Sequence, residues 1–334
     1  MIVTVTPNPS IDRTVNLPDR LVRGAVLRAT AVSSEPGGKG VNVARALTLA
    51  GFGTVAVLPA AEHDPMLAGL RSIGVAVHAI GAAGTVRTNL TLTEPDGTTT
   101  KINEPGATLT VAEAAHLARA VTDHARSARW VVLSGSLPPG LPDSWYADMV
   151  AALRPLGCKI AVDTSDAPLA ALAADLQRAA PDLLKPNAEE LAGLAGVTAE
   201  SLESAVHHGD AAPVVAAARQ LIDRGVGAVL ATLGAAGAVL VDAESAWLAT
   251  PPPIRPRSTV GAGDSSLAGY VRAEVEGAGS PGRLQMAVAY GSAAAALPGS
   301  ALPAPAQINL DDVALTALLA DPRPEDDPRP EGKK

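Results

Sequence analysis

The chain has 334 residues, of which 47% are hydrophobic and 18% are charged. This composition supports a sizeable core and excludes a disordered chain, and the formal net charge of -8 argues against a nucleic-acid-binding protein. The N-terminus lacks a basic region followed by an apolar run, and no segment reaches the ~18 uncharged apolar residues of a membrane span. We therefore expect a cytoplasmic protein with neither a nucleic acid nor a membrane as its partner.

Short apolar, β-branched segments alternate with alanine-rich helical segments along the chain. This alternation predicts an α/β fold with a central, mostly parallel sheet that is covered by helices on both faces. The expected strands are 2–6, 54–58, 75–80, 131–134, 159–163, 182–185, 228–232 and 238–241. The expected helices are 40–50, 64–73, 111–126, 143–154, 167–178, 188–195, 213–224, 264–276, 281–296 and 310–319.

Two polar segments, 11–34 and 85–104, interrupt this alternation. Both are rich in Thr and Arg and read as strands, and the second contains a turn at Pro95-Asp96-Gly97. We expect them to form a small sheet that stands off the main domain. That domain is expected to be a single unit over residues 1–320, followed by a disordered, Pro- and charge-rich tail at 321–334.

Polar residues follow four of the apolar strands at their downstream ends. In open parallel sheets, ligands bind beyond the carboxyl ends of the strands. Four such ends favour one shared cleft over a set of separate turns. The segments are Ser134-Gly135-Ser136, Asp163-Thr164-Ser165, Lys185-Pro186-Asn187 and Thr232-Leu233-Gly234.

The segment Gly261-Ala262-Gly263-Asp264 opens an alanine-rich helix and has the strongest chemical pattern. Its glycines let backbone N–H groups at a helix N-terminus face an anion, and a transferring phosphoryl group is such an anion. Asp264 lies in the first turn, where it could accept a proton from a substrate hydroxyl. The alternative is that Asp264 only caps the helix and the glycines only shape a turn.

A second glycine-rich segment, 36–45, carries Lys39 and also precedes a helix. It is not a Walker A loop, because Gly40 rather than Ser or Thr follows the lysine. The segment suits the close approach of a polyhydroxy ligand, with Lys39 matched to an anionic substituent. The alternative is a plain turn.

Asn187 and Glu190 are three residues apart and can share one face of a helical first turn. A carboxamide and a carboxylate there suit a hydrated Mg²⁺ ion, which takes few protein ligands, but they equally suit a helix cap. The segment 232–238 is either a hairpin or a loop that lets backbone approach nucleotide phosphates. Asp12, after the first strand, is either a hydroxyl-binding acid or a turn residue.

Taken in order, these segments resemble the ribokinase-like PfkB family of carbohydrate kinases, from Ile2 to about Pro303. Within the family, the chain looks most like the bacterial 1-phosphofructokinases. The stretches that carry this resemblance are 4–12 (TVTPNPSID), 37–42 (GGKGVN), 101–106 (KINEPG) and 134–140 (SGSLPPG).

The resemblance implies a ribokinase-like fold and transfer of the γ-phosphate of ATP to the 6-hydroxyl of fructose 1-phosphate. Asp264 would be the general base, and the backbone of Gly261, Ala262 and Gly263 would form the anion hole. The sugar phosphate would be bound by Asp12, Gly38, Lys39, Asn42, Arg87, Asn103 and Ser136. The nucleotide would be bound by Lys185, Asn187, Thr232, Gly234, Gly237, Gly263 and Ser292, and Mg²⁺ would be held through water by Asn187 and Glu190.

The resemblance also implies that the small sheet is a lid that pairs two subunits into a homodimer. It leaves a monovalent cation open as a further cofactor. Alternatives within the family are a tagatose-6-phosphate kinase and a 6-phosphofructokinase; some relatives of the latter carry a lysine where this chain has Val26. An alternative of another class is a non-catalytic sugar-phosphate sensor, which should have lost its base or anion hole.

Overall fold

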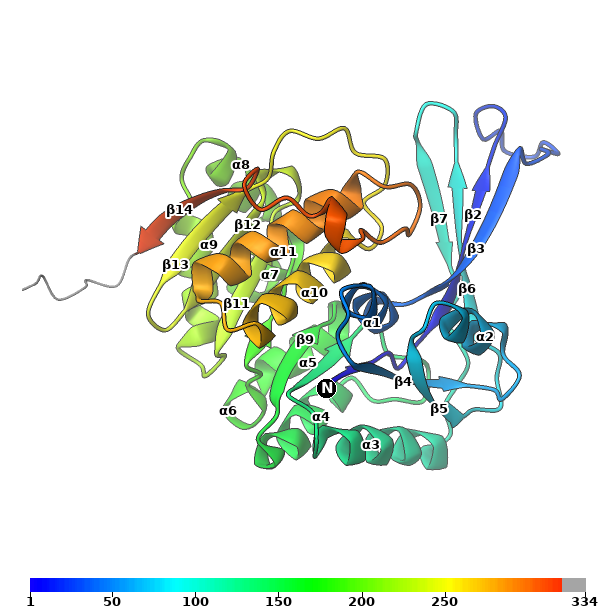
Figure 1. Cartoon of the computed structure of the whole chain (residues 1–334), viewed down its shortest axis with the longest axis horizontal. Helices are drawn as coiled ribbons and strands as arrows, with labels where there is room; N and C mark the ends of the chain where they lie inside the picture. The colour runs from blue at the N-terminus through cyan, green and yellow to red at the C-terminus, as the bar shows by residue number, and fades with distance from the viewer. Residues whose placement is uncertain (320–334) are drawn as a thin grey trace, which may run out of the picture.

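The computed structural model describes residues 1–319 and places their strands in two separate sheets with helices around them (Figure 1). The larger sheet contains β1 (Ile2–Val5), β4 (Thr54–Ala60), β5 (Ala76–Gly81), β8 (Trp130–Ser134), β9 (Lys159–Asp163), β10 (Leu183–Leu184), β11 (Ala228–Thr232), β12 (Ala238–Asp242), β13 (Ala246–Thr250) and β14 (Ala314–Leu319). The smaller sheet contains β2 (Ser10–Asn16), β3 (Ala31–Gly37), β6 (Arg87–Thr93) and β7 (Thr99–Asn103).

The larger sheet has ten strands in the order β14-β13-β12-β11-β10-β9-β8-β1-β4-β5. Neighbouring strands are parallel from β11 to β5, and the pairs from β11 to β14 are antiparallel. The expected mostly parallel α/β sheet is therefore confirmed. The helices around it are α1 (Lys39–Leu49), α2 (Pro65–Ser72), α3 (Val111–Ala125), α4 (Trp145–Leu153), α5 (Asp166–Ala174), α6 (Leu176–Ala179), α7 (Ala188–Ala195), α8 (Ala199–His207), α9 (Ala212–Ile222), α10 (Ala262–Val275) and α11 (Ser280–Ala295).

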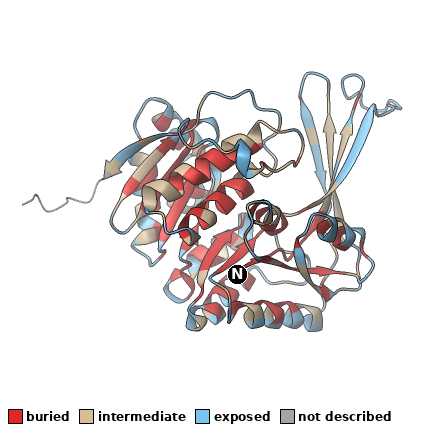
Figure 2. Cartoon of the chain, in the orientation of Figure 1, coloured by how far each residue is buried: buried red, intermediate tan, exposed pale blue. Residues whose placement is uncertain are grey.

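Helices cover both faces of this sheet because successive strand residues point to opposite sides and both sides are apolar. On β8, Val131 joins the core formed with α3 to α9, whereas Val132 joins the core beneath α1, α10 and α11. Figure 2 shows that buried residues fill the sheet and the inner sides of α10 and α11. The parallel strands consequently end at one common edge, where the loops that follow them meet.

The small sheet has the strand order β3-β2-β6-β7 and stands away from the larger sheet at the upper right of Figure 1. Strand β2 follows closely on β1 and pairs with β3 antiparallel and with β6 parallel. The expected turn between β6 and β7 is confirmed, because Gly97 has a φ of 90° and donates its N–H to Glu94 O at 3.0 Å. The small sheet is thus anchored where the parallel strands end.

Several expected elements differ in the structure. The helix expected at 310–319 is wrong, because Ala314–Leu319 forms the edge strand β14, whose hydrogen bonds come from pairing with β13. Strand β13 and helix α8 were not predicted, and the helix expected at 167–178 is divided into α5 and α6 at Asp175. The tail expected at 321–334 lies outside the described residues. No helix within residues 1–319 is both long and apolar enough to span a bilayer.

Candidate active site

A cavity of about 1070 Å³ lies where the parallel strands end, between the larger sheet and the base of the small sheet. The loops after β1, β8, β9 and β10 supply one part of its wall, and β2 and β6 supply another. The expected shared cleft therefore exists. The predicted residues that line it are Asp12, Gly38, Lys39, Asn42, Arg87, Ser136, Lys185, Asn187, Thr232, Gly234, Gly237, Gly261, Ala262, Gly263, Asp264 and Ser292.

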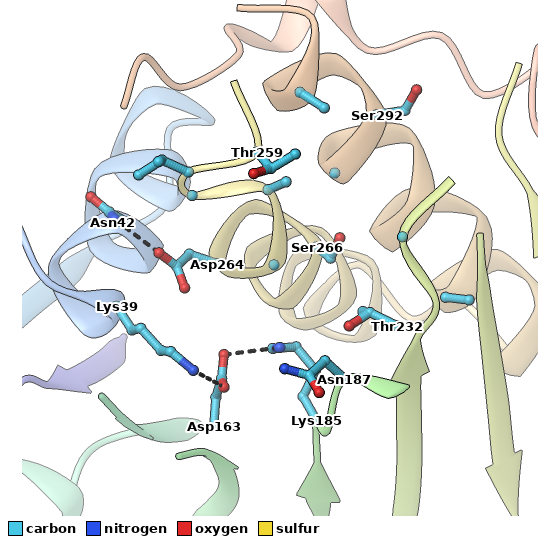
Figure 3. A pocket seen from close by; sticks show the side chains of 18 of the residues that line it. Lys39, Asn42, Asp163, Lys185, Asn187, Thr232, Thr259, Asp264, Ser266 and Ser292 are labelled. Carbon is cyan, nitrogen blue, oxygen red and sulfur yellow. Dashed lines mark hydrogen bonds and ion pairs between the residues drawn. The ribbon is translucent and has the colours of Figure 1, made fainter. Parts of the chain in front are cut away.

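Helix α10 begins at the cavity wall in an unusual way. Its N-cap residue, Gly261, has a φ of 77°, and no side chain caps the first turn. Glycine adopts this left-handed conformation without the steric cost of a side chain. Asp264 in that turn is only 7% exposed, and its Oδ2 accepts a hydrogen bond of 2.8 Å from Asn42 Nδ2 on α1 (Figure 3). The helix thus brings a buried carboxylate and uncapped backbone donors to one point.

Two lysines share a single aspartate beside this carboxylate (Figure 3). Lys39 Nζ lies 2.7 Å from Asp163 Oδ1, and Lys185 Nζ forms an ion pair of 3.1 Å with Asp163 Oδ2. Asp163 ends β9 and is fully buried, so its charge requires such partners. The group brings one lysine from the start of α1 and another from the loop after β10 to the middle of the cavity.

The same charges set the protonation of Asp264. Burial raises its pKa from 3.8 to about 6, and the negative charge of Asp163 adds to this rise, whereas Lys39, Asn42 and Lys185 oppose it. Burial would also raise the pKa of Asp163, but the two lysines hold it below its ordinary value. Burial lowers the pKa of Lys39, yet Asp163 and Asp264 outweigh this effect and raise it. The pKa of Asp264 therefore lies closer to neutral pH than that of an ordinary aspartate, while the carboxylate remains mostly ionised at pH 7.

The glycines on either side of Lys39, at the start of α1, are required by close packing against the end of β1. Gly38 has a φ of 108°, and a Cβ atom there would lie 2.7 Å from Thr6 Cγ2. A Cβ atom on Gly40 would lie 2.6 Å from the carbonyl oxygen of Val5. Side chains at either position would push α1 away from the sheet and displace Lys39. The glycine pattern thus positions the lysine, whichever ligand it serves.

Arg87 on β6 is the main cationic group at the small-sheet end of the cavity. It donates from Nη1 to Glu104 O at 2.9 Å and from Nη2 to Ser136 Oγ at 3.2 Å, while its buried Nε has no partner among the described residues. Burial lowers its pKa, and the charges of Asp12 and Glu104 oppose this change. An unpaired donor on a guanidinium that faces a cavity suits an anionic group such as a phosphate.

The opposite end of the cavity is formed by η2 (Gly234–Ala236), α11 and the segment 251–256. The connection between β11 and β12 is a hairpin, and Gly237 has a φ of 101° with no room for a side chain against Ala249 O. The hairpin reading of the segment 232–238 is therefore confirmed; the hairpin also lines the cavity, and its approach to nucleotide phosphates stays a prediction. Ser292 of α11 faces the same space (Figure 3).

The model of the pfkB family of carbohydrate kinases matches residues 5–307 of this chain. The chain belongs to this family. It is therefore a sugar-phosphate kinase, and ATP and a divalent cation are implied by its membership.

Similar proteins agree with this assignment. The kinase is 40% identical to the 1-phosphofructokinase of Xanthomonas campestris pv. campestris over 83% of this chain and 85% of the relative. It is 33% identical to the ATP-dependent 6-phosphofructokinase isozyme 2 of Escherichia coli over 90% of this chain and 94% of the relative. The crystal structure of phosphofructokinase-2 from Escherichia coli in complex with substrates and products superimposes with a TM-score of 0.82 at 31% identity, covering 92% of this chain and 96% of that one.

Two residues predicted for the site are not among those that line the cavity of the kinase. Asn103 is exposed on β7, an edge strand one strand spacing farther out than its partner Asn89 on β6. Glu190 turns back to accept the N–H of Asn187 at 2.8 Å, and Asn187 Oδ1 accepts the N–H of Glu190 at 2.8 Å. The helix-cap alternative for this pair is therefore present as a capping box.

Several residues that line the cavity of the kinase carry no local sequence pattern that indicates a role. Asp163 is, in the sequence, only a polar residue at the end of a strand, and nothing in its local pattern indicates that two lysines meet it. Asn89 donates from Nδ2 to Asp12 Oδ1 at 3.2 Å, but it lies in a Thr-rich strand without a distinct pattern. The proline-rich segment 251–256 and Val288 form an apolar wall that only the tertiary arrangement reveals.

Proposed function

We propose that the kinase transfers the γ-phosphoryl group of ATP to the 6-hydroxyl of fructose 1-phosphate and forms fructose 1,6-bisphosphate. The observation that carries this proposal is the buried carboxylate of Asp264 at the uncapped start of α10, with Lys39 and Lys185 beside it. A phosphoryl transfer needs a proton acceptor for the attacking hydroxyl and positive charge around the transferred group. These groups meet at one point of the cavity.

In the proposed reaction, Asp264 accepts the proton of the sugar hydroxyl. With a pKa of about 6, Asp264 is mostly ionised at pH 7 and is a stronger base than an exposed aspartate. The backbone N–H groups at the start of α10 face the transferred phosphoryl group, aided by the positive end of the helix dipole. Lys39 and Lys185 add positive charge on either side of Asp163.

Arg87 is proposed to bind the phosphate that the sugar already carries. Its guanidinium lines the cavity, and Nη2 together with the buried, unpaired Nε would offer two donors to a phosphate that displaces Ser136 Oγ. Asp12 and Asn89, on adjacent strands of the small sheet, are proposed to hold the sugar hydroxyls. The name of the Xanthomonas campestris relative favours fructose 1-phosphate, and the name of the Escherichia coli relative makes fructose 6-phosphate the second candidate.

Asn187 and Glu190 are proposed to hold Mg²⁺ through water. Asn187 lines the cavity. The Glu190 carboxylate accepts a hydrogen bond from the backbone N–H of Asn187, so contact with the ion through water fits better than direct ligation. Within residues 1–319 there is no group of three or more His, Cys, Asp or Glu side chains arranged for a metal, which agrees with an ion that takes few protein ligands. Bound with ATP, the ion would neutralise charge on the phosphates.

The small sheet is proposed to act as a lid that pairs with the lid of a second copy. Val32 on the edge strand β3 is 50% exposed and Ile102 on the edge strand β7 is 54% exposed, so both open edges carry apolar side chains. Such edges need covering in a soluble protein. Light scattering should give a dimer for the wild type and a monomer for the double variant Val32→Lys/Ile102→Lys; a wild-type monomer at micromolar concentration would contradict the pairing.

The substrate proposal is tested by a coupled ADP-release assay with ATP, Mg²⁺ and a panel of sugars. Fructose 1-phosphate should give the highest kcat/KM, followed by fructose 6-phosphate and tagatose 6-phosphate. A clear preference for either 6-phosphate would overturn the choice of substrate, and binding without ADP release would indicate a sensor instead of an enzyme.

The role of Arg87 is tested by Arg87→Lys with Arg13→Lys as its control, since Arg13 is an exposed arginine of the neighbouring strand. Because a lysine cannot reproduce the two-pronged contact, kcat/KM for fructose 1-phosphate should fall about 10- to 100-fold. Turnover of unphosphorylated fructose at high concentration, measured in parallel, should be equal in Arg87→Lys and the wild type. Equal losses with both sugars would remove Arg87 from phosphate binding.

A further inference from the structure

A chain of polar contacts leads from the base of the small sheet to Asp264. Arg45 on α1 donates from Nη2 to Glu35 Oε2 and from Nη1 to Pro36 O, both at 3.0 Å. The same Nη1 lies 3.4 Å from Asn42 Oδ1, and Asn42 Nδ2 donates to Asp264 Oδ2 at 2.8 Å. Neither Arg45 nor Glu35 lines the cavity. These contacts therefore reach the Asp264 carboxylate through Asn42, from the side that faces away from the cavity.

The position of Arg45 decides which way the Asn42 carboxamide faces. Asn42 is 3% exposed and lies between a guanidinium, which only donates, and a carboxylate, which only accepts when ionised. One orientation satisfies both neighbours, with Oδ1 toward Arg45 and Nδ2 toward Asp264. The flipped amide would place its NH₂ against the guanidinium and its oxygen against the carboxylate. Arg45 and Asn42 are three residues apart on one helix, so α1 keeps them adjacent.

The other contacts of Arg45 hold it in place. Its side chain is only 12% exposed, and the partner carboxylate of Glu35 also accepts a hydrogen bond of 3.2 Å from Ser300 Oγ, in the loop after α11. Arg45 thus joins the end of β3 to α1, while Glu35 is held by a second element. A partly buried guanidinium with three acceptors has little freedom to move away from Asn42.

We propose that Arg45 is a positioning residue, which fixes the Asn42 amide so that its N–H faces Asp264 and which ties this arrangement to the base of the small sheet. The inference rests on the proposed function, in which Asp264 is the general base. Without Arg45 the amide can turn its oxygen toward Asp264, an orientation that favours the protonated acid. Ionised Asp264 then loses a donor, and a higher pH is needed to produce the base.

Other charges around Asp264 stay in place when Arg45 is changed. Lys39 on α1, Lys185 after β10 and Asp163 at the end of β9 are the charged groups that face it among the described residues. None of them is bonded to Arg45. A change at Arg45 therefore acts on the carboxylate through Asn42 and through the loss of the guanidinium charge, and Arg45→Lys keeps that charge.

The test measures the pH profile of kcat/KM for the sugar phosphate from pH 5 to 9 in the wild type, Arg45→Leu and Arg45→Lys. Loss of one hydrogen bond to a charged group should move the acid limb of Arg45→Leu up by about one pH unit. The activity loss should then be about fivefold at pH 6 and under about 1.5-fold at pH 8. Arg45→Lys should move the limb by a smaller amount, because the ammonium keeps the positive charge but cannot contact Glu35 and Asn42 together.

Arg219→Leu is the matched control, because it removes an arginine of α9 that donates to two backbone carbonyls away from the cavity. Its acid limb should coincide with that of the wild type. A purely structural role of Arg45 would lower activity by the same factor at every pH, as partial unfolding does. The proposal is overturned if the acid limb of the pH profile stays in place in both Arg45→Lys and Arg45→Leu. If Arg45→Leu does not fold, the result for Arg45→Lys decides alone.

A second readout does not depend on turnover. The carboxyl ¹³C resonance of Asp264, assigned by its absence in Asp264→Asn, should titrate at a higher pH in the Arg45 variants. An unchanged midpoint contradicts the positioning role even while Asp264 remains essential. If Asp264→Asn turns over normally, the proposed base itself fails, so the two failures are distinguishable.

Discussion

Helices α7 and α10 both begin at the wall of the cavity with acidic residues in the first turn, but their N-termini are satisfied differently. In α7 the side chains of Asn187 and Glu190 close a reciprocal capping box. In α10 the N-cap is Gly261, and no side chain takes up the first N–H groups. The acidic residue Asp264 instead turns sideways to Asn42.

This difference determines which helix start is available to a ligand. A capping box satisfies backbone donors within the chain, so α7 is stable without any bound group. An uncapped start leaves donors and the positive end of the helix dipole for an anion. The two starts look alike as patterns of small and acidic residues, yet only α10 is expected to act on the transferred phosphoryl group.

The largest effect is expected from Asp264→Asn. The amide cannot accept the hydroxyl proton, so kcat should fall by at least ~10²-fold, the low end of the contribution of a general base. Sugar-phosphate binding, measured by calorimetry, should remain. Turnover close to that of the wild type would show that α10 contributes no base and would remove the main contrast with α7.

Gly261→Ala, with Gly196→Ala as its control, tests the uncapped start itself. Gly196 ends α7 with a φ of 71° and Gly261 precedes α10 with a φ of 77°, and neither glycine has a neighbour closer than 3.8 Å to an added Cβ. Both variants should lose about 1–2 kcal/mol of unfolding free energy in urea titrations. Only Gly261→Ala should also lower kcat, roughly tenfold or more, because the N–H groups behind it shift. Equal kcat values would refute the anion-hole role.

The pH dependence of the wild type should report the raised pKa of Asp264. With a pKa of about 6, the ionised fraction and thus kcat/KM should fall about tenfold between pH 7 and pH 5. An ordinary aspartate would keep nearly full activity at pH 5. An acid limb near pH 4 would therefore contradict the buried environment of this carboxylate.

The raised pKa of Asp264 also affects stability. Activity should rise with pH, whereas the contribution of Asp264 to the free energy of unfolding should fall with pH. Because the folded-state pKa is raised, the contribution of Asp264 to stability is fully present below pH 3.8 and is lost as the pH rises through about 6. Asp264→Asn removes this loss, so the variant should be more stable than the wild type at pH 7 and not at pH 4. Urea unfolding at the two pH values measures this difference.

The smallest effect is expected at α7. Asn187→Ala should cost about 1 kcal/mol of unfolding free energy, as loss of a cap usually does. Thr110→Ala is a matched control, since Thr110 and Glu113 form a capping box on α3, and Thr110 does not line the cavity. The two should be equally destabilised.

Glu190→Gln keeps a cap acceptor but removes the charge proposed to organise Mg²⁺. The Mg²⁺ concentration for half-maximal activity should rise in this variant and stay unchanged in Thr110→Ala. An unchanged Mg²⁺ requirement in Glu190→Gln would leave α7 with its capping role alone.

Local patterns determined much of this protein in advance. The alternation of apolar strands with alanine-rich helices was sufficient for the α/β class, because both faces of a parallel sheet must be covered and the central strands, such as β1, β8 and β9, are apolar at successive positions. Gly261 to Asp264 and Gly38 to Lys39 were identifiable because glycine before a helix is a local backbone requirement. The polar residues after four strands indicated a shared cleft, since parallel strands end at one edge.

The tertiary structure alone decided how these residues interact. Strand β14 could not be told from a helix, because its hydrogen bonds come from β13, which is distant in the sequence. Asp163 acquires its role only when Lys39 and Lys185, 146 residues apart in numbering, converge on it. Asn103 does not line the cavity, because it lies on β7 at the edge of the small sheet. Charge pairing and burial depend on long-range packing, and so the sequence could single out Asp264 as a candidate base but could not name the neighbours that set its pKa.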